Sequence, residues 1–259
     1  MSTIIYPSPI FGPVHSRRLG LSLGINLMPA DGKVCTFDCI YCECGLNAER
    51  RPKQRRPSRE EVAEALAAQL QQMHRADVHP DVLTFAGNGE PTAHPDFSGI
   101  IDDTIALRDR YCPEARISVL SNATMILKPS VHAALLRVDN NIQKLDTVDV
   151  DYIHRIDRPT GHYDLEAIIE RLVAFGGHVV IQTMFMQGTD ADGADVCNTT
   201  EAFVAPWLQA LERIRPESVM IYTVARETPI SSIEKARPDE LDAIAARVRA
   251  AGLDCSVAY

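Results

Sequence analysis

No stretch of this sequence is apolar over the roughly 18 residues that a membrane-spanning helix needs. The first residues, Met-Ser-Thr-Ile-Ile-Tyr-Pro, lack the basic start and the long apolar run of a secretory signal. Low-complexity segments and domain-scale linkers are missing as well. We therefore expect a single domain over residues 1–259 that is cytoplasmic and makes no contact with a membrane.

An excess of positive charge is also missing, since 35 acidic residues outnumber 26 lysines and arginines and the formal net charge is −9. That balance argues against broad, non-specific attraction to nucleic acid. One basic run departs from it and comprises Arg50, Arg51, Lys53, Arg55, Arg56 and Arg59. Such a run is usually a solvated surface, although it also fits contact with RNA or another polyanion.

The seven cysteines do not form the even set of a disulfide framework. Cys112, Cys197 and Cys255 stand alone, and their simplest interpretation is as small buried apolar residues. The other four lie between positions 35 and 44. In a reducing compartment, such clustering favours metal binding.

Three of the clustered cysteines, Cys35, Cys39 and Cys42, can hold one metal centre. A four-iron cluster takes four thiolates, so three leave one iron with an open coordination position. An open position suits a substrate or cofactor that binds the metal directly, and it therefore predicts chemistry. The alternative is a structural zinc ion with Cys44 as fourth ligand, because zinc prefers four ligands in tetrahedral geometry.

Short β-branched segments alternate with amphipathic helical segments along the chain. We expect strands over residues 23–28, 82–86, 117–120, 144–148, 179–186 and 219–224, with an edge strand over 256–259. Helices are expected after Ser58, over 97–111, near 130–137, after Asp164, around 203–211 and after Pro238. About six alternations predict a parallel α/β sheet, and functional residues of such folds gather at the carboxyl ends of strands.

Polar and glycine-rich turns follow the expected strands. The turn Gly87-Asn88-Gly89-Glu90-Pro91 comes after the second strand, where glycines let a ligand approach the backbone and Pro91 stiffens the chain. Its carbonyl groups and the Glu90 carboxylate suit a ligand's ammonium group. Ser121 and Asn122 follow the third strand and fit either a ligand contact or an ordinary turn.

Side chains on the later strands are less specific. Strand alternation places Gln182, Met184 and Met186 on one face of the fifth strand. That face fits inward contacts to a ligand as well as an ordinary core. Tyr222 on the sixth strand has the same two interpretations.

The pattern Cys-x3-Cys-x2-Cys, with an aromatic residue before the third cysteine, resembles the signature of radical S-adenosylmethionine enzymes. The resemblance implies an α/β fold built as an open partial (β/α)6 barrel. It also implies a 4Fe–4S cluster on Cys35, Cys39 and Cys42, with S-adenosylmethionine on the fourth iron. In that family one electron from the cluster cleaves S-adenosylmethionine, and the 5′-deoxyadenosyl radical abstracts hydrogen from a substrate. A flavodoxin- or ferredoxin-type electron donor is implied as partner.

The same resemblance assigns roles to residues around the cysteines. Gly87–Pro91 resembles the family's Gly-Gly-Glu-Pro segment, which binds the methionine amino group. Ser121 and Asn122 resemble polar residues that meet the methionine carboxylate or the ribose. The remaining contacts, to ribose and adenine, are expected from Tyr41, Gln182, Met184 and Tyr222.

Segments outside these motifs are similar to a subgroup of iron–sulfur oxidoreductases related to wyosine-tRNA synthases. They comprise residues 11–20, 22–26, 144–146, 156–159 and 221–223. Wyosine-forming enzymes carry a second cluster whose cysteines precede the main motif. No cysteine precedes Cys35 here, so we expect one cluster and no pyruvate-dependent wyosine synthesis.

These observations predict a minimal radical S-adenosylmethionine enzyme with an unidentified substrate. The candidate reactions are modification of RNA, modification of a peptide or protein, and activation of a glycyl-radical enzyme. The alternative is a non-catalytic module that binds zinc or an iron–sulfur cluster and grips RNA through the basic run.

Overall fold

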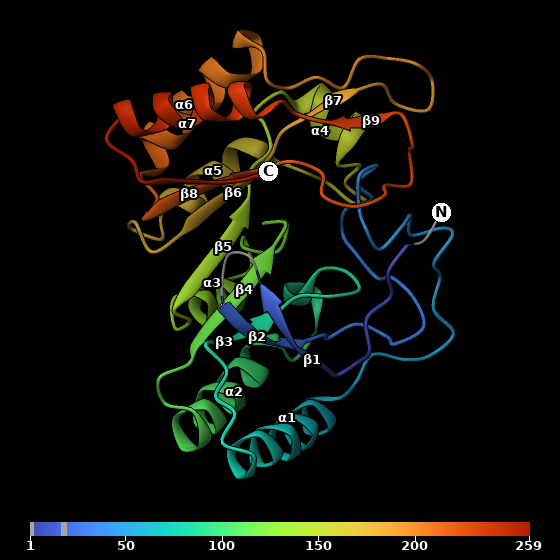
Figure 1. Cartoon of the computed structure of the whole chain (residues 1–259), viewed down its shortest axis with the longest axis vertical. Coiled ribbons are helices and arrows are strands. Elements are labelled where there is room, and N and C mark those ends of the chain that lie inside the picture. The colour runs from blue at the N-terminus through green and yellow to red at the C-terminus, as the bar shows by residue number, and fades with distance from the viewer. Residues whose placement is uncertain (1–2, 17–19) are drawn as a thin grey trace.

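The computed structural model describes residues 3–16 and 20–259, so Arg17 and Arg18 lie outside the described residues. Its main sheet has the strand order β1-β2-β3-β4-β5-β6-β8-β10 (Figure 1). β1 and β2 are antiparallel, and all other neighbours are parallel. The strands are β1 (Ile10–Ser16), β2 (Gly20–Ile25), β3 (Val82–Phe85), β4 (Arg116–Ser121), β5 (Asn140–Lys144), β6 (Val180–Met184), β8 (Ser218–Tyr222) and β10 (Cys255–Ala258).

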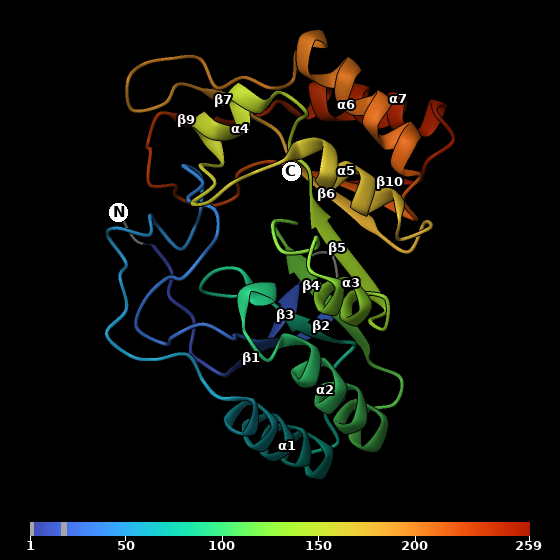
Figure 2. The same ribbon diagram turned by 180° about the vertical axis from the view of Figure 1, so that it is seen from behind.

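Helices connect the parallel strands and cover the sheet from outside. In Figure 2, which views the molecule from behind, α2, α3 and α5 lie in front of the strands. The helices are α1 (Arg59–Arg75), α2 (Phe97–Tyr111), α3 (Pro129–Leu135), α4 (Val150–Ile156), α5 (Leu165–Val173), α6 (Glu201–Ile214) and α7 (Pro238–Ala250), with a 3-10 turn η1 (Pro91–Ala93). A second sheet pairs β7 (Met186–Gly188) with β9 (Ile233–Lys235).

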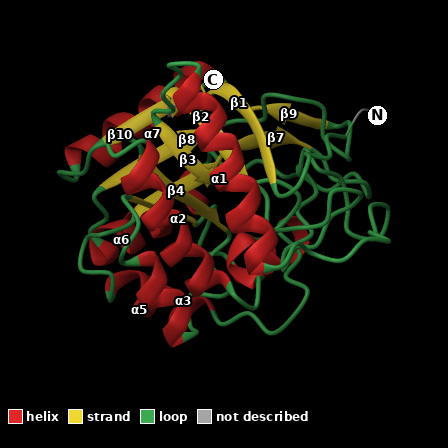
Figure 3. Ribbon diagram, turned by 90° about the horizontal axis from the view of Figure 1, so that it is seen from below, coloured by secondary structure: helices red, strands yellow, loops and turns green. Residues whose placement is uncertain are grey.

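The main sheet is open, because β1 and β10 each pair with a neighbour on one side only. This arrangement confirms the α/β fold and the open partial barrel expected from the sequence. Figure 3 shows helices gathered around the strands and the long loops gathered on one side of the molecule. In the described part of the chain, none of the helices combines the length and apolar character that crossing a bilayer requires.

Local sequence signals place several helices where they were expected. Ser58 accepts a hydrogen bond from the Glu61 backbone N–H and completes the capping box of α1. Asp164 caps α5 in the same way through the Ala167 N–H. The apolar stripes of these helices then pack on the strands in one continuous core, where Leu66 and Leu172 are fully buried.

The strand expected over residues 144–148 lies earlier, because β5 spans Asn140–Lys144. β5 is rich in polar residues, and a search for apolar runs therefore misses it. In the folded chain, hydrogen bonds compensate for the burial of these polar side chains. Asn141 Nδ2 donates to His178 O at 3.0 Å, and Gln143 Nε2 donates to Asn141 Oδ1 at 2.6 Å. The predicted strand therefore lies four residues too late in the sequence.

Two other differences concern strand ends. The expected strand over 179–186 is divided, since β6 ends at Met184 and Met186 begins β7. Strand β1 was not expected, because Pro13 weakens its strand signal; Pro13 is tolerated because β1 is an edge strand whose pairing with β2 is irregular between Phe11 and Val14.

Candidate active site at the cysteine loop

One cavity of about 650 Å³ lies at the carboxyl ends of the parallel strands. The cysteine loop forms part of its wall, and the turns after β3 and β4 form another part. Its lining includes Cys35, Cys39, Tyr41, Cys42, Cys44, Gly87, Gly89, Glu90, Ser121, Asn122, Lys144, Gln182, Met184 and Tyr222. Most of the residues expected to bind the cluster or S-adenosylmethionine thus line a single space.

The cysteine loop is held in place by a second apolar core. Phe37 and Ile40 are buried in it, next to Tyr152 and Ile156 of α4. The Ile40 N–H donates to Ile156 O at 3.0 Å, so the loop pairs with the end of that helix. This packing holds the loop against α4 and places the three cysteines at the cavity wall.

The three cysteines meet different polar neighbours. The Asn122 amide lies 3.6 Å from Cys35 Sγ, and the Cys39 thiol donates to Asp157 Oδ1 at 3.5 Å. Burial and the Glu90 carboxylate raise the pKa of Cys35 to about 12, and burial with the Asp157 charge raises the pKa of Cys39 well above its usual value. Because thiolates bind iron, metal binding must displace protons from both thiols.

Cys42 differs from Cys35 and Cys39 in its surroundings. A hydrogen bond with the Cys44 thiol lowers the pKa of Cys42 to about 6, despite burial, and the Lys33 ammonium acts in the same direction. Gly87 O, 3.4 Å from Cys44 Sγ, is an alternative acceptor for the single proton of that thiol. Within the described residues, no three or more histidine, cysteine or acidic side chains converge on one point to hold a single ion. Cys44 and the other three cysteines of the loop thus line the cavity without converging on one point.

Lys33 is a site residue that the sequence reasoning missed. Its side chain is only 1% exposed, and Nζ donates to Gly45 O at 2.7 Å across the cysteine loop. Burial lowers the pKa of Lys33, but the charges of Cys42, Cys35 and Cys39 outweigh burial and raise it. A lone lysine two residues before a cysteine motif gives no signal in the sequence, since lysines are ordinarily exposed.

Only part of the Gly87–Pro91 turn lines the cavity, and the rest packs into the protein. Gly87 and Gly89 line the cavity, and both have positive φ values, 127° and 140°, which favour glycine. Asn88 is fully buried away from the cavity lining, where its amide donates to Tyr6 O at 2.8 Å and to Pro29 O at 2.9 Å. Pro91 opens η1 and does not line the cavity either. The side chains of Asn88 and Pro91 therefore do not face the space in which a ligand would bind.

Glu90 joins two of the loops that surround the cavity. Its Oε2 atom accepts from the Asn122 N–H at 2.7 Å, and Oε1 accepts from the Thr92 N–H at 3.0 Å. Burial raises the pKa of Glu90, although these hydrogen bonds oppose the shift. The carboxylate thus positions the turn after β4, where Asn122 also donates to the Thr36 hydroxyl at 2.9 Å.

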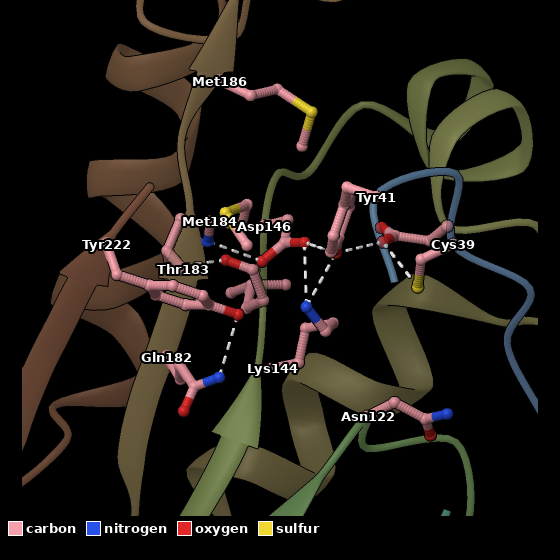
Figure 4. Close-up of polar contacts among 12 residues, drawn as sticks. Cys39, Tyr41, Asn122, Lys144, Asp146, Gln182, Thr183, Met184, Met186 and Tyr222 are labelled. Carbon is pink, nitrogen blue, oxygen red and sulfur yellow. Dashed lines mark hydrogen bonds and ion pairs between the residues drawn. The ribbon is translucent and has the colours of Figure 1, made fainter. Parts of the chain in front are cut away.

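A buried polar network joins the cysteine loop to β5 (Figure 4). The Tyr41 hydroxyl lies between Asp146, to which it donates, and Asp157 Oδ1 at 2.8 Å. Lys144 Nζ donates to the Tyr41 hydroxyl at 2.7 Å and to Asp146 Oδ2 at 3.1 Å. Tyr41 is only 7% exposed and lines the cavity, while its hydroxyl is held by charged groups.

The strand residues proposed as ribose and adenine contacts lie on the opposite wall. Gln182 Nε2 donates to the Tyr222 hydroxyl at 2.9 Å, which links β6 to β8 (Figure 4). Met184 also lines the cavity, whereas Met186 is fully buried in the second core. The expectation that all three alternate residues of 182–186 face one space thus holds for Gln182 and Met184.

The basic run lies outside the cavity lining and is largely paired within the chain. Arg55 forms two hydrogen bonds with Glu61, and Arg59 forms two with Asp103, all between 2.6 and 2.7 Å. Arg56 donates to Ala93 O at 3.1 Å. Arg50 also donates to the Thr3 hydroxyl, so four of the six basic side chains serve the fold, which favours the interpretation as an ordinary surface.

Fold and site together define a class of protein: an open α/β barrel whose three-cysteine loop and polar strand ends face one cavity. The chain belongs to the radical SAM superfamily, whose family model matches residues 31–199. Members of this superfamily are enzymes that use a 4Fe–4S cluster and S-adenosylmethionine, and the match confirms the resemblance seen in the cysteine motif.

Individual relatives agree with this assignment. A UPF0026 protein from Helicobacter pylori is 30% identical over 239 residues, which cover 91% of this chain and 72% of that protein. A radical SAM methyltransferase from Sphaerobacter thermophilus is similar in structure, with a TM-score of 0.67 at 14% identity, over 92% of this chain and 66% of that one. SuiB from Streptococcus suis, solved bound to S-adenosylmethionine, has a TM-score of 0.63 at 16% identity, over 91% of this chain and 50% of SuiB. These two likenesses establish the fold.

Proposed function

We propose that this chain cleaves S-adenosylmethionine reductively at a 4Fe–4S cluster held by Cys35, Cys39 and Cys42, and that the radical abstracts hydrogen from an RNA or polypeptide substrate. The observation that carries the proposal is the single cavity shared by these cysteines and the polar strand ends. Its volume of about 650 Å³ suits a bound nucleoside, since small-molecule pockets span roughly 300–1,000 Å³.

The residues present fit such a cluster. Three thiols from one ordered loop reach the cavity, and a buried ammonium beside them offsets negative charge. When bound there, the cluster would supply the electron that splits the carbon–sulfur bond of S-adenosylmethionine. The protein's part is to bind and orient the ligand and to exclude water, which the buried walls around Tyr41 and Met184 provide.

The ligand's polar groups have partners of suitable chemistry around the cavity. Gly87 and Gly89 expose backbone without side chains, as the binding of an amino group requires. Ser121 and the Asn122 amide, on the adjacent turn after β4, line the same cavity and suit the carboxylate or ribose. Tyr41, Gln182, Met184 and Tyr222 supply aromatic, amide and thioether contacts to the nucleoside.

A macromolecular substrate is favoured by the open side of the barrel, where β1 and β10 leave the sheet unclosed. SuiB, which shares the fold, was also solved bound to its precursor peptide SuiA. Activation of a glycyl-radical enzyme is a polypeptide case of the same proposal. A one-electron donor of the flavodoxin or ferredoxin type completes the reaction.

Anaerobic reconstitution with iron and sulfide tests the proposal. The wild-type chain is expected to bind about four iron and four sulfide ions and, with dithionite and S-adenosylmethionine, to form 5′-deoxyadenosine. Cys39→Ala is expected to bind no stable cluster and to form none, whereas Cys255→Ala, outside the cavity lining, is expected to match the wild type. A protein that takes up zinc but no iron and sulfide contradicts the proposal, as does a loaded cluster that yields no 5′-deoxyadenosine.

The substrate class calls for a separate comparison. Modified nucleosides and peptides are quantified by mass spectrometry in cells with and without the gene. Loss of one modified nucleoside indicates an RNA substrate, and loss of one modified peptide indicates a polypeptide. If neither changes, the proposed macromolecular substrate is wrong.

A further inference from the structure

The most unusual group near the cysteines is the ammonium of Lys33. Its side chain is 1% exposed, although lysines are almost never fully buried without a partner. The ammonium donates to Gly45 O at 2.7 Å, lies 3.6 Å from the Asp38 carboxylate and hydrogen-bonds the Cys42 side chain. Asp38 is itself 22% exposed and accepts the Asn47 N–H at 2.7 Å, so it compensates the buried charge only in part.

A buried charge is costly unless opposite charge lies close to it. The Lys33 side chain crosses the loop that holds Cys35, Cys39 and Cys42 and bonds Gly45 O, three residues after Cys42. Cysteines bind a metal as thiolates, so a bound cluster would place negative charge in this loop. Three thiolates on a cluster would therefore supply the negative charge that offsets the cost of burying the Lys33 ammonium.

The backbone fixes this position from both sides. The Lys33 N–H donates to Arg50 O at 2.7 Å, and the next N–H, that of Val34, donates to Asn88 O at 2.9 Å. The side chain then crosses the loop to Gly45, which follows the cysteine segment. The ammonium cannot move away from the cysteines unless these hydrogen bonds break.

We propose that Lys33 is a positioning residue that holds a permanent positive charge against the three cysteine ligands and thereby favours the reduced form of the cluster. The inference rests on the proposed function. Reduction adds one electron from an external reductant to a centre that already carries three thiolates, and no bond breaks and no proton is required. A fixed cation close to that centre stabilises the added charge, most strongly where water is excluded.

The test is an EPR-monitored redox titration of the reconstituted protein without S-adenosylmethionine. Lys33→Met removes the charge and keeps the length of the side chain. At a given potential its ratio of reduced to oxidised cluster is expected to fall at least tenfold, which is a midpoint about 59 mV more negative for one electron. Lys33→Arg retains the charge and is expected to recover most of the difference. A Lys33→Met midpoint equal to that of the wild type overturns the inference.

Asp38→Asn provides an independent test in case Lys33→Met does not assemble a cluster. It removes negative charge beside the ammonium, and an asparagine oxygen can still accept the Asn47 N–H. The expected midpoint is less negative than that of the wild type. An unchanged or more negative midpoint contradicts the inference. Failure of the wild type to bind iron contradicts the proposed function instead, so the two failures are distinguishable.

Discussion

Lys144 Nζ donates a hydrogen bond to the Tyr41 hydroxyl at 2.7 Å, although 103 positions separate the two residues in the sequence. The contact joins β5 to the cysteine loop inside the cavity wall (Figure 4). It also divides Tyr41 into two parts with different roles. The hydroxyl belongs to a buried charged network, and only the ring is available to a nucleoside.

Substitutions of Tyr41 separate these two parts. Tyr41→Phe is expected to lower the free energy of unfolding of the metal-free protein by about 1–3 kcal/mol, because Lys144 and Asp146 each lose a buried hydrogen-bond partner. Its affinity for S-adenosylmethionine should stay within about threefold of the wild type, since the ring remains. Tyr41→Ala should weaken that affinity at least about tenfold, or 1.4 kcal/mol. Urea denaturation and calorimetric titration measure the two effects, and wild-type affinity in Tyr41→Ala would exclude the proposed ring contact.

Gly89 permits close contact between the turn after β3 and the cysteine loop. A Cβ atom at Gly89 would lie 1.9 Å from Val34 O, and the positive φ adds backbone strain. We expect Gly89→Ala to destabilise the metal-free protein by about 3 kcal/mol and to reduce iron content after reconstitution. Gly161→Ala is the matched control, because its Cβ meets nothing within 4 Å, and it should change stability by less than about 0.5 kcal/mol. Equal stability of the two variants would show that the Val34 contact is not tight in solution.

Asp157 gives the metal-free protein a distinct pH dependence. Burial, with the nearby Asp146 charge, raises the pKa of Asp157 from 3.8 to about 7. Between about pH 4 and pH 7 the folded chain therefore holds a proton that the unfolded chain has lost. The contribution of Asp157 to the free energy of unfolding is present below this window, falls as pH rises through it, and is constant above it.

Replacement of Asp157 by asparagine removes this titration. Denaturation measured at several pH values should show that the stability of the wild type relative to Asp157→Asn declines from pH 4 to pH 7 and then levels off. The slope attributable to one proton is at most about 1.4 kcal/mol per pH unit. A difference that stays constant across this window would mean that Asp157 is already ionised in the folded chain.

Much of the architecture is determined by local sequence. The capping box at Ser58 starts α1 where it was expected, and the helix over 97–111 is α2 within the same bounds. These elements obey short-range rules of periodicity and capping, which need no knowledge of distant residues. The position of β5 was not predicted from the sequence, because its polar residues are stabilised by partners such as His178 O that only the folded chain supplies.

The sequence by itself determined the metal-binding motif, the family and the strand–turn order that carries the polar groups, because each of these is written in contiguous residues. Only the tertiary structure decided that Lys33 is buried beside the cysteines, that Asn88 supports the N-terminal segment, and that Asp146 and Asp157 hold the Tyr41 hydroxyl. The physical reason is that a charged or polar side chain acquires its role from burial and from partners far away in the chain. Those partners meet only when the parallel strands bring their carboxyl ends together.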